Sequence, residues 1–285
     1  AALDEGFTQY LTAYGMRKID GDTVVELPAD GWYRRRFEKE RLVMDDEIYY
    51  GFMRSAMNYS DPRLNTHSDQ FENSYRDGYG HVYYKTATML YNLEYVLGDT
   101  LFANALKNYF DEWQFRHPYF DDFRKSVIRY TKVDLNWFFD QWLESEKRID
   151  YAITKVKKSD NPDSYIVRFK RKGDMQMPVD FTVTDQNDSI HQFHISNTWF
   201  NKETDATTLP KWTGFGNLNT TYDAEIVIPA GIRSVQIDPT NRLADVNMLD
   251  NRSATPVSFE FDHQLYNRPD WKSYEFFGRP DIWYN

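Results

Sequence analysis

The chain of 285 residues lacks cysteine altogether, which excludes disulfide bonds, thiolate nucleophiles and cysteine metal sites. Long hydrophobic runs are missing as well, since none approaches the ~20 residues that a membrane-spanning helix needs. Basic residues are too few for a nucleic-acid surface, because 34 Lys and Arg stand against 44 Asp and Glu and the net charge is −10. We therefore expect no transmembrane segment in this sequence and no nucleic-acid partner.

Familiar catalytic signatures are also absent from the sequence. There is no G-x-S-x-G elbow, P-loop or dinucleotide-binding glycine motif, and none of the six histidines stands in an H-E-x-x-H motif. His191 and His194 are three residues apart, a spacing that places them on opposite faces of a strand. We interpret them as an ordinary exposed and half-buried pair rather than as metal ligands.

Residues 1–150 carry the periodicity of helices. Apolar side chains in residues 83–97 form one helical stripe, Gly98 follows as a stop signal, and Thr100 is predicted to cap the next helix. Further helices are expected over residues 5–16 and 35–59, another is expected to begin at Asp121 or Asp122, and Asp134 is predicted to cap a fourth short helix. Short helices joined by polar turns predict antiparallel stacked pairs.

After residue 150 the period changes from 3.6 to 2. Met177, Val179, Phe181 and Val183 alternate with polar residues, and similar short runs follow between turn signals. The predicted fold is therefore α+β and multidomain. It has a helical part over residues 1–150, a small antiparallel β-sandwich over 151–250 and an aromatic extended tail over 251–285.

Both ends of the sequence look cut. It begins A-A-L-D-E, without an initiator Met or a signal segment, and it closes on the aromatic run R-P-D-I-W-Y-N, where a terminus is more often polar. We expect a piece of a longer protein, whose missing N-terminal and C-terminal parts are partners of this piece in the same chain.

Three segments carry most of the functional information. Residues 3–11 read L-D-E-G-F-T-Q-Y-L, residues 82–87 read V-Y-Y-K-T-A, and residues 133–143 read V-D-L-N-W-F-F-D-Q-W-L. Taken alone, Glu5 is a helix-start carboxylate that the helix dipole favours, and Tyr83 is a core aromatic.

Together these segments resemble the N-E-G-F-A-x-Y, Y-x-K-G and D-L-x-x-F-F-x-Q-W elements of the gluzincin aminopeptidases, relatives of aminopeptidase N. They occur in the family's order and with plausible spacing, across residues 1 to about 150. The resemblance implies that the helical part is the C-terminal part of a zincin-like catalytic domain. The sandwich fits the family more loosely, and the common architecture of the family does not cover the tail.

The resemblance also implies roles for individual residues. Glu5 matches the glutamate that is the third zinc ligand, and Tyr83 matches the tyrosine that donates to the oxyanion. Asp4 and Thr86 depart from the family pattern at positions that supply no ligand, and Lys85 is expected to be structural. In such sites a zinc-activated water attacks the peptide carbonyl with the help of a glutamate general base.

In this family the H-E-x-x-H motif is followed by eighteen residues and then the ligand Glu, so both histidines and the catalytic glutamate would lie before residue 1. The substrate-binding G-A-M-E-N strand would lie further upstream. The resemblance therefore implies a parent protein that is a zinc-dependent metallopeptidase, an aminopeptidase acting on peptide substrates. The fragment alone is expected to bind no zinc and to be inactive.

Two further expectations complete the interpretation. The sequence of residues 83–98 and 135–143 resembles that of the envelope-associated branch of the family from Gram-negative bacteria. This resemblance implies an extracytoplasmic location in the periplasm or cell envelope. The alternative function is that of a non-catalytic peptidase-like scaffold or binding protein. The aromatic tail with its repeated R-P-D phrase favours this alternative, because exposed rings suit docking to a partner. The sequence upstream of Ala1 would discriminate between the two.

Overall fold

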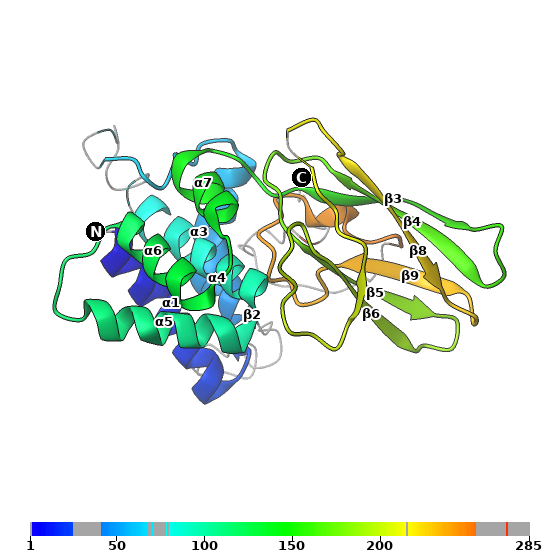
Figure 1. Ribbon diagram of the computed structural model, residues 1–285, viewed down its shortest axis with the longest axis horizontal. Helices are drawn as coiled ribbons and strands as arrows, with labels where there is room; N and C mark the ends of the chain where they lie inside the picture. Colours follow the sequence, from blue (N-terminus) through cyan, green and yellow to red (C-terminus); the bar gives the residue numbers. More distant parts are fainter. Residues whose placement is uncertain are drawn as a thin grey trace, which may run out of the picture.

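The protein has a helical half and a β-sheet half that lie side by side in the computed structural model (Figure 1). The structure describes residues 2–24, 41–67, 80–214 and 216–254, together with residues 70, 78 and 272. Among these residues, no helix combines the length and the apolar character that crossing a bilayer requires. The predicted α+β class is confirmed.

Helix α4 lies at the centre of the helical half, because all twelve of its residues are buried. It packs against α1, α5 and two π-helical turns, η1 and η4, the second of which runs directly into it. The helices and turns are α1 (Ala2–Asp20), η1 (Asp45–Tyr49), α3 (Tyr50–Met57), η4 (Gly80–Lys85), α4 (Thr86–Leu97), α5 (Asp99–Trp113), α6 (Phe120–Thr131) and α7 (Asn136–Glu144).

Several of the predicted helix boundaries are wrong. Helix α6 begins at Phe120, so Asp121 and Asp122 lie inside it, and Leu135 rather than Asp134 is the N-cap of α7. Gly98, at φ 82°, both ends α4 and precedes the first residue of α5, so Thr100 lies inside α5 and does not cap it. Gly98 adopts this left-handed conformation readily because it has no Cβ. Residues 41–42 form strand β2 (Arg41–Leu42), which pairs with β1 (Thr23–Val24), so the helix predicted over 35–59 is confined to its later part among the described residues.

The β-sheet half is a sandwich of two sheets. One has the strand order β3-β4-β8 and the other has the order β7-β6-β5-β9. The strands are β3 (Tyr151–Lys158), β4 (Ser164–Arg171), β5 (Val179–Asp185), β6 (Ile190–Ile195), β7 (Thr207–Leu209), β8 (Thr221–Val227) and β9 (Ile232–Ile237), followed by a 3₁₀ turn, η5 (Met248–Asp250). All pairs are antiparallel except β6 with β7, which is parallel and departs from the predicted antiparallel sandwich.

Aromatic rings fill the space between the two sheets. The ring centroids of Phe169 in β4 and Phe181 in β5 lie 4.8 Å apart, and Phe181 stacks on Phe193 of β6 at 4.9 Å. Strand β5 alternates strictly between buried and half-buried residues, as its period of 2 predicts. These rings are the part of the hydrophobic core that lies within the sandwich, and the same core continues into the helical half.

Most of the predicted tail lies outside the described residues. Of residues 255–285 the structure describes Lys272, whose ammonium group forms an ion pair with the carboxylate of Asp45 in η1. The division into three domains and the extended conformation of the tail remain predictions.

Candidate active site

Helix α1 crosses η4 at a point where Gly6 supplies the space. A Cβ atom on Gly6 would lie 2.3 Å from the Cβ of Thr86 and 2.7 Å from the carbonyl oxygen of Val82. Distances under 3.0 Å are not compatible with a real Cβ, so only glycine permits this approach. The side chain that Gly6 accommodates is that of Thr86, one of the residues that depart from the family pattern.

This contact brings the two predicted site residues onto adjoining turns. Glu5 precedes Gly6 in the first turn of α1, and Tyr83 follows Val82 in η4. Both side chains are half-buried, whereas the neighbouring Asp4 is exposed. The structure thus places Glu5 and Tyr83 on two elements in direct contact.

The turn η4 is held from a second side by α3. A Cβ on Gly51 would lie 2.2 Å from the ring of Tyr84, so this ring packs flat against the backbone of α3. Single π-helical turns occur frequently at functional sites, because the extra residue changes the direction of the side chains around it. Tyr83 lies within such a turn, between Val82, which Gly6 approaches closely, and Tyr84, whose ring packs against Gly51.

Lys85 has the structural position that was predicted for it. It is 2% exposed, and its Nζ donates to Oδ2 of Asp61 at 2.9 Å and to the carbonyl oxygen of Pro62 at 2.5 Å. Burial lowers the pKa of Lys85, and the carboxylate of Asp61 opposes that shift. Asp61 also pairs with Arg148, so Lys85 ties η4 to the loop after α3 and to the segment that enters the sandwich.

His81 belongs to the same buried structure. Its Nε2 lies 2.9 Å from the carbonyl oxygen of Leu64, and burial lowers the pKa of the imidazole to about 4. The ring is therefore neutral near pH 7, and its contact with Leu64 attaches η4 to the preceding loop.

The residues present supply only part of a zinc donor set. A carboxylate is one of the side chains that bind Zn²⁺, and Glu5 offers one at the surface of α1 next to η4. Within the part of the chain that the structure describes, no group of three or more His, Cys, Asp or Glu side chains is arranged to hold a metal ion. Glu5 fits a zinc ligand in chemistry, and the remaining ligands would have to come from elsewhere.

The two histidines of β6 pair with acids of β5. His191 Nε2 lies 3.0 Å from Asp185 Oδ2, and His194 Nδ1 lies 2.6 Å from Asp180 Oδ1. Burial raises the pKa of Asp180, but His194 and Lys202 outweigh it and hold that pKa below its usual range. These pairs join strands within one sheet. The predicted burial of the two histidines is wrong, because His194 is fully buried and His191 is half-buried rather than exposed.

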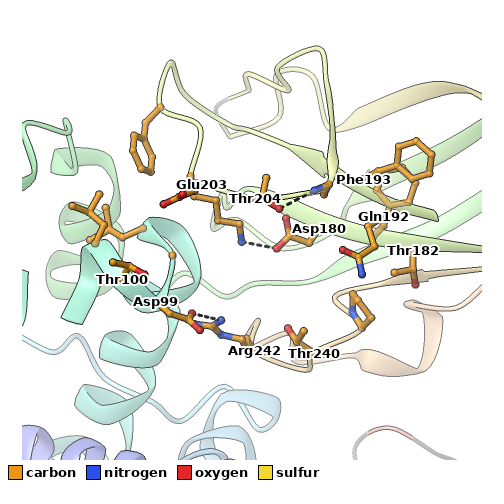
Figure 2. A pocket seen from close by; sticks show the side chains of 18 of the residues that line it. Asp99, Thr100, Asp180, Thr182, Gln192, Phe193, Glu203, Thr204, Thr240 and Arg242 are labelled. Atoms are coloured by element: carbon orange, nitrogen blue, oxygen red, sulfur yellow. Dashed lines mark hydrogen bonds and ion pairs between the residues drawn. The ribbon is translucent and has the colours of Figure 1, made fainter. Parts of the chain in front are cut away.

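A cavity of about 740 Å³ separates the start of α5 from the sheet formed by β5 and β6. Figure 2 shows the ion pair of Asp99 with Arg242 at one side of this cavity, and Asp180 and Glu203 at the other side, where Asp180 pairs with Lys202. Its lining includes neither Glu5 nor Tyr83, so the cavity is separate from the predicted site.

Sequence reasoning missed several polar residues that join the two halves, namely Glu94, Tyr95, Asp180, Lys202 and Arg242. It also missed Tyr10, which bonds to Glu94 within the helical half. One signal was available for Glu94, because it is the single acidic residue of α4, in a segment that is otherwise largely apolar. A buried carboxylate in such a segment needs a partner.

Comparisons with known proteins agree with the resemblance seen in the sequence. The sequence model of the peptidase family M1 domain matches residues 1–142. The crystal structure of Legionella pneumophila aminopeptidase A in complex with aspartic acid is similar in fold, with a TM-score of 0.51 and 11% sequence identity. The similarity covers 86% of this chain but only 23% of that chain. None of the curated proteins matches the sequence significantly.

Proposed function

Since residues 1–142 belong to the peptidase family M1 domain, we propose that this chain forms part of a zinc-dependent peptidase that removes residues from the N-termini of peptides. The observation that carries the proposal is the contact of α1 with η4 at Gly6, which sets Glu5 and Tyr83 on adjoining turns. The peptidase activity, the zinc and the preference for N-termini are proposals about the whole protein.

In this proposal the carboxylate of Glu5 would be one of the ligands that hold the metal. Glu5 lies in the first turn of α1, and an ionised carboxylate is the form that binds a cation. Zinc, when bound, acts as a Lewis acid and lowers the pKa of a bound water toward ~7. The two histidine ligands and the general-base glutamate of H-E-x-x-H would belong to sequence upstream of residue 1.

Tyr83 acts on the substrate rather than on the metal. Its hydroxyl donates a hydrogen bond to the oxygen of the scissile carbonyl, where negative charge grows during the attack by water. The packing of η4 against Gly6 and Gly51 limits the movement of the turn that carries the ring. A donor fixed in advance stabilises the transition state without reorganisation at the moment of reaction.

The test measures zinc content and release of N-terminal amino acids by the full-length protein, using aminoacyl anilides and their N-acetylated counterparts. We expect about one zinc per chain, cleavage of the free aminoacyl anilides and loss of both zinc and activity in Glu5→Ala. Asp4→Ala is the matched control, because Asp4 is the exposed neighbour of Glu5 on the same helical turn. Full activity in Glu5→Ala would overturn the ligand assignment.

Residues 1–285 alone should bind zinc no better than a casual surface site and should not cleave the anilides, because one carboxylate is an incomplete ligand set. One tightly held zinc per chain after dialysis against a mild chelator would contradict this proposal. Absence of an upstream H-E-x-x-H from the full-length protein would favour the non-catalytic scaffold instead.

We also propose that the protein acts outside the cytoplasm, in the periplasm or cell envelope. The proposal is supported by the resemblance of residues 83–98 and 135–143 to the envelope-associated branch of the family. Cell fractionation of the source organism tests it, and recovery of the full-length protein with cytoplasmic markers alone would contradict it.

A further inference from the structure

The segment of residues 242–244, which follows β9, reaches from the sandwich into the helical half. The main-chain N–H of Ala244 donates to Oδ1 of Asn92 in α4 at 3.1 Å. The carbonyl oxygen of Arg242 accepts a hydrogen bond from the hydroxyl of Tyr49 in η1. Ala244, Asn92 and Tyr49 are all fully or almost fully buried, so this segment is fixed among the helices.

The side chain of Arg242 pairs with two acids of the helical half. Its Nη2 lies 3.2 Å from Oε1 of Glu94 in α4, and its Nη1 donates to Oδ1 of Asp99 in α5 at 2.7 Å. The guanidinium group also lies over the ring of Tyr91, 5.5 Å from the centroid. Arg242 thus joins the sandwich to α4 and α5 at once.

The second oxygen of Glu94 connects α4 to α1. Oε2 of Glu94 accepts a hydrogen bond of 2.8 Å from the hydroxyl of Tyr10, and both residues are at least 95% buried. Burial raises the pKa of Glu94, whereas the guanidinium of Arg242 and the hydroxyl of Tyr10 oppose that shift. Without Arg242, the carboxylate of Glu94 would be a buried charge without its cation, a strongly unfavourable state.

These contacts fix α1 against α4 at two separate points. One is the approach of Gly6 to Thr86, and the other is the hydrogen bond from Tyr10 to Glu94, which lies further along both helices. Two points of attachment determine the angle between two helices as well as their separation. Glu5 belongs to α1, and Tyr83 lies in the turn that runs into α4.

We propose that Arg242, Glu94 and Tyr10 are positioning residues, through which the sandwich holds the helix of Glu5 in register with the turn of Tyr83. The role rests on the proposed peptidase function, because Glu5 and Tyr83 have their assigned roles only there. The sandwich is then a structural part of the active site and not a passive spacer.

The test compares Arg242→Met, Glu94→Gln, the double variant and Tyr10→Phe in the full-length protein. Arg233→Met is the matched control, because Arg233 also lies in the β-sheet half but forms an exposed ion pair with Asp188. We expect Arg242→Met to lower kcat by about 10–100-fold, with a smaller change in KM, because a misplaced donor and ligand act on the transition state. The affinity for zinc should fall as well.

The double variant separates positioning from general damage to the fold. Replacing Glu94 by Gln in the Arg242→Met protein removes the unpaired charge, so it should restore most of kcat and of the zinc affinity. Tyr10→Phe removes a single hydroxyl and should lower kcat by a smaller factor with the unfolding temperature close to that of the wild type. If Arg242→Met is insoluble, kcat and zinc affinity of Tyr10→Phe and of the double variant are compared with those of Arg233→Met instead.

Two results would overturn the inference while leaving the proposed function intact. One is an Arg242→Met protein with kcat and zinc affinity within twofold of those of Arg233→Met. The other is a double variant as impaired as Arg242→Met. An inactive wild-type protein would count against the proposed function itself. In that case the network is tested by a double-mutant cycle of Arg242 and Glu94 in the unfolding of residues 1–285, and additive effects there would refute it.

Discussion

Gly6 is the residue on which the geometry of the candidate site depends most directly. An alanine there would place a Cβ against the Cβ of Thr86 and against the main chain of Val82, neither of which can move aside easily. Because overpacking of this kind costs ~1–3 kcal/mol, α1 has to shift away from η4. The shift would move Glu5, which precedes Gly6.

We therefore expect Gly6→Ala to destabilise the chain by about 1–2 kcal/mol, after the better helix propensity of alanine has offset part of the cost. Chemical denaturation of residues 1–285 measures the effect. Gly15→Ala in the same helix is the control, since its Cβ would meet nothing within 4 Å, and it should stabilise the chain by up to ~1 kcal/mol. Equal effects of the two substitutions would refute the close contact.

Asp150 provides a pH-dependent test at the same scale. Its Oδ1 is buried without a hydrogen-bond partner among the described residues, and burial, aided by Asp250, raises the pKa of Asp150 to about 6. Because this pKa lies above the ~3.9 of an unfolded chain, the folded protein binds the proton more tightly. The stability contributed by protonation is complete below about pH 4 and is lost as the pH rises through about 6.

Asp150→Asn should therefore leave stability unchanged at pH 4 and increase it relative to the wild type at pH 8. The gain should be on the order of 1 kcal/mol, a figure reduced for the partial exposure of this side chain. Urea denaturation at the two pH values measures it, with the exposed Asp160→Asn as control. If the unfolding free energies of Asp150→Asn and the wild type differ by the same amount at pH 4 and pH 8, the burial of an ionised Asp150 is contradicted.

Among the helices and strands, the sequence predicted the ones whose hydrophobic pattern is uninterrupted. Strand β5 alternates without a break, and the stripe of residues 83–97 ends at Gly98, where α4 ends in the structure. Strand β3 went unrecognised because a register shift between Ile153 and Lys155 interrupts its alternation. Strand β7 has only three residues, too few for any period to be visible.

Features that depend on distant partners could not be predicted in the same way. The π-helical turn η4 reads as ordinary helix in the sequence, because its hydrogen-bond pattern is set by packing against α1 and α3. The pairing of Glu94 with Arg242 joins residues that are far apart in the chain. For the candidate site, Glu5 and Tyr83 came from motif resemblance, whereas the contact at Gly6 that unites them required the structure.

The aromatic tail permits a prediction about a whole segment. Its large rings would each contribute ~1.5–3 kcal/mol if fully buried. They belong to Phe259, Phe261, Tyr266, Trp271, Phe276, Phe277 and Trp283. The ion pair of Lys272 with Asp45 supports contact of the tail with the helical half.

Deleting residues 255–285 should therefore lower the unfolding temperature of the remaining chain, as calorimetry would show. Asp45→Asn in the undeleted chain should have a much smaller effect, because a single partly exposed ion pair contributes only ~0–1 kcal/mol. A deleted chain that unfolds at the original temperature would show that the tail does not pack on residues 1–254.

At the scale of the whole molecule, the two halves are joined by buried polar contacts as well as by apolar packing. The main-chain N–H of Asp180 in β5 donates to the hydroxyl of Tyr95 in α4 at 2.8 Å, close to the ion pair of Asp180 with Lys202. Together with the segment of residues 242–244, these contacts attach the sandwich along the C-terminal part of α4. The helices of the candidate site are therefore supported from the β-sheet half.

The hydroxyl of Tyr83 can be tested separately from its ring, because phenylalanine keeps the ring at this position of η4 and removes only the hydroxyl. In a zinc peptidase the hydroxyl acts on the developing negative charge, whereas in a structural role only the ring matters. The two interpretations differ in kcat alone, since an interaction made only in the transition state leaves KM and zinc content unchanged.

The most direct measurement is the kcat of Tyr83→Phe in the full-length protein, with zinc content and KM determined in parallel and Tyr84→Phe as the matched neighbour. We expect kcat to fall by roughly 10²–10³, equivalent to about 2.7–4 kcal/mol, at unchanged zinc content and KM. Tyr84→Phe should remain close to the wild type. A Tyr83→Phe protein that keeps most of its kcat would contradict the catalytic role of Tyr83.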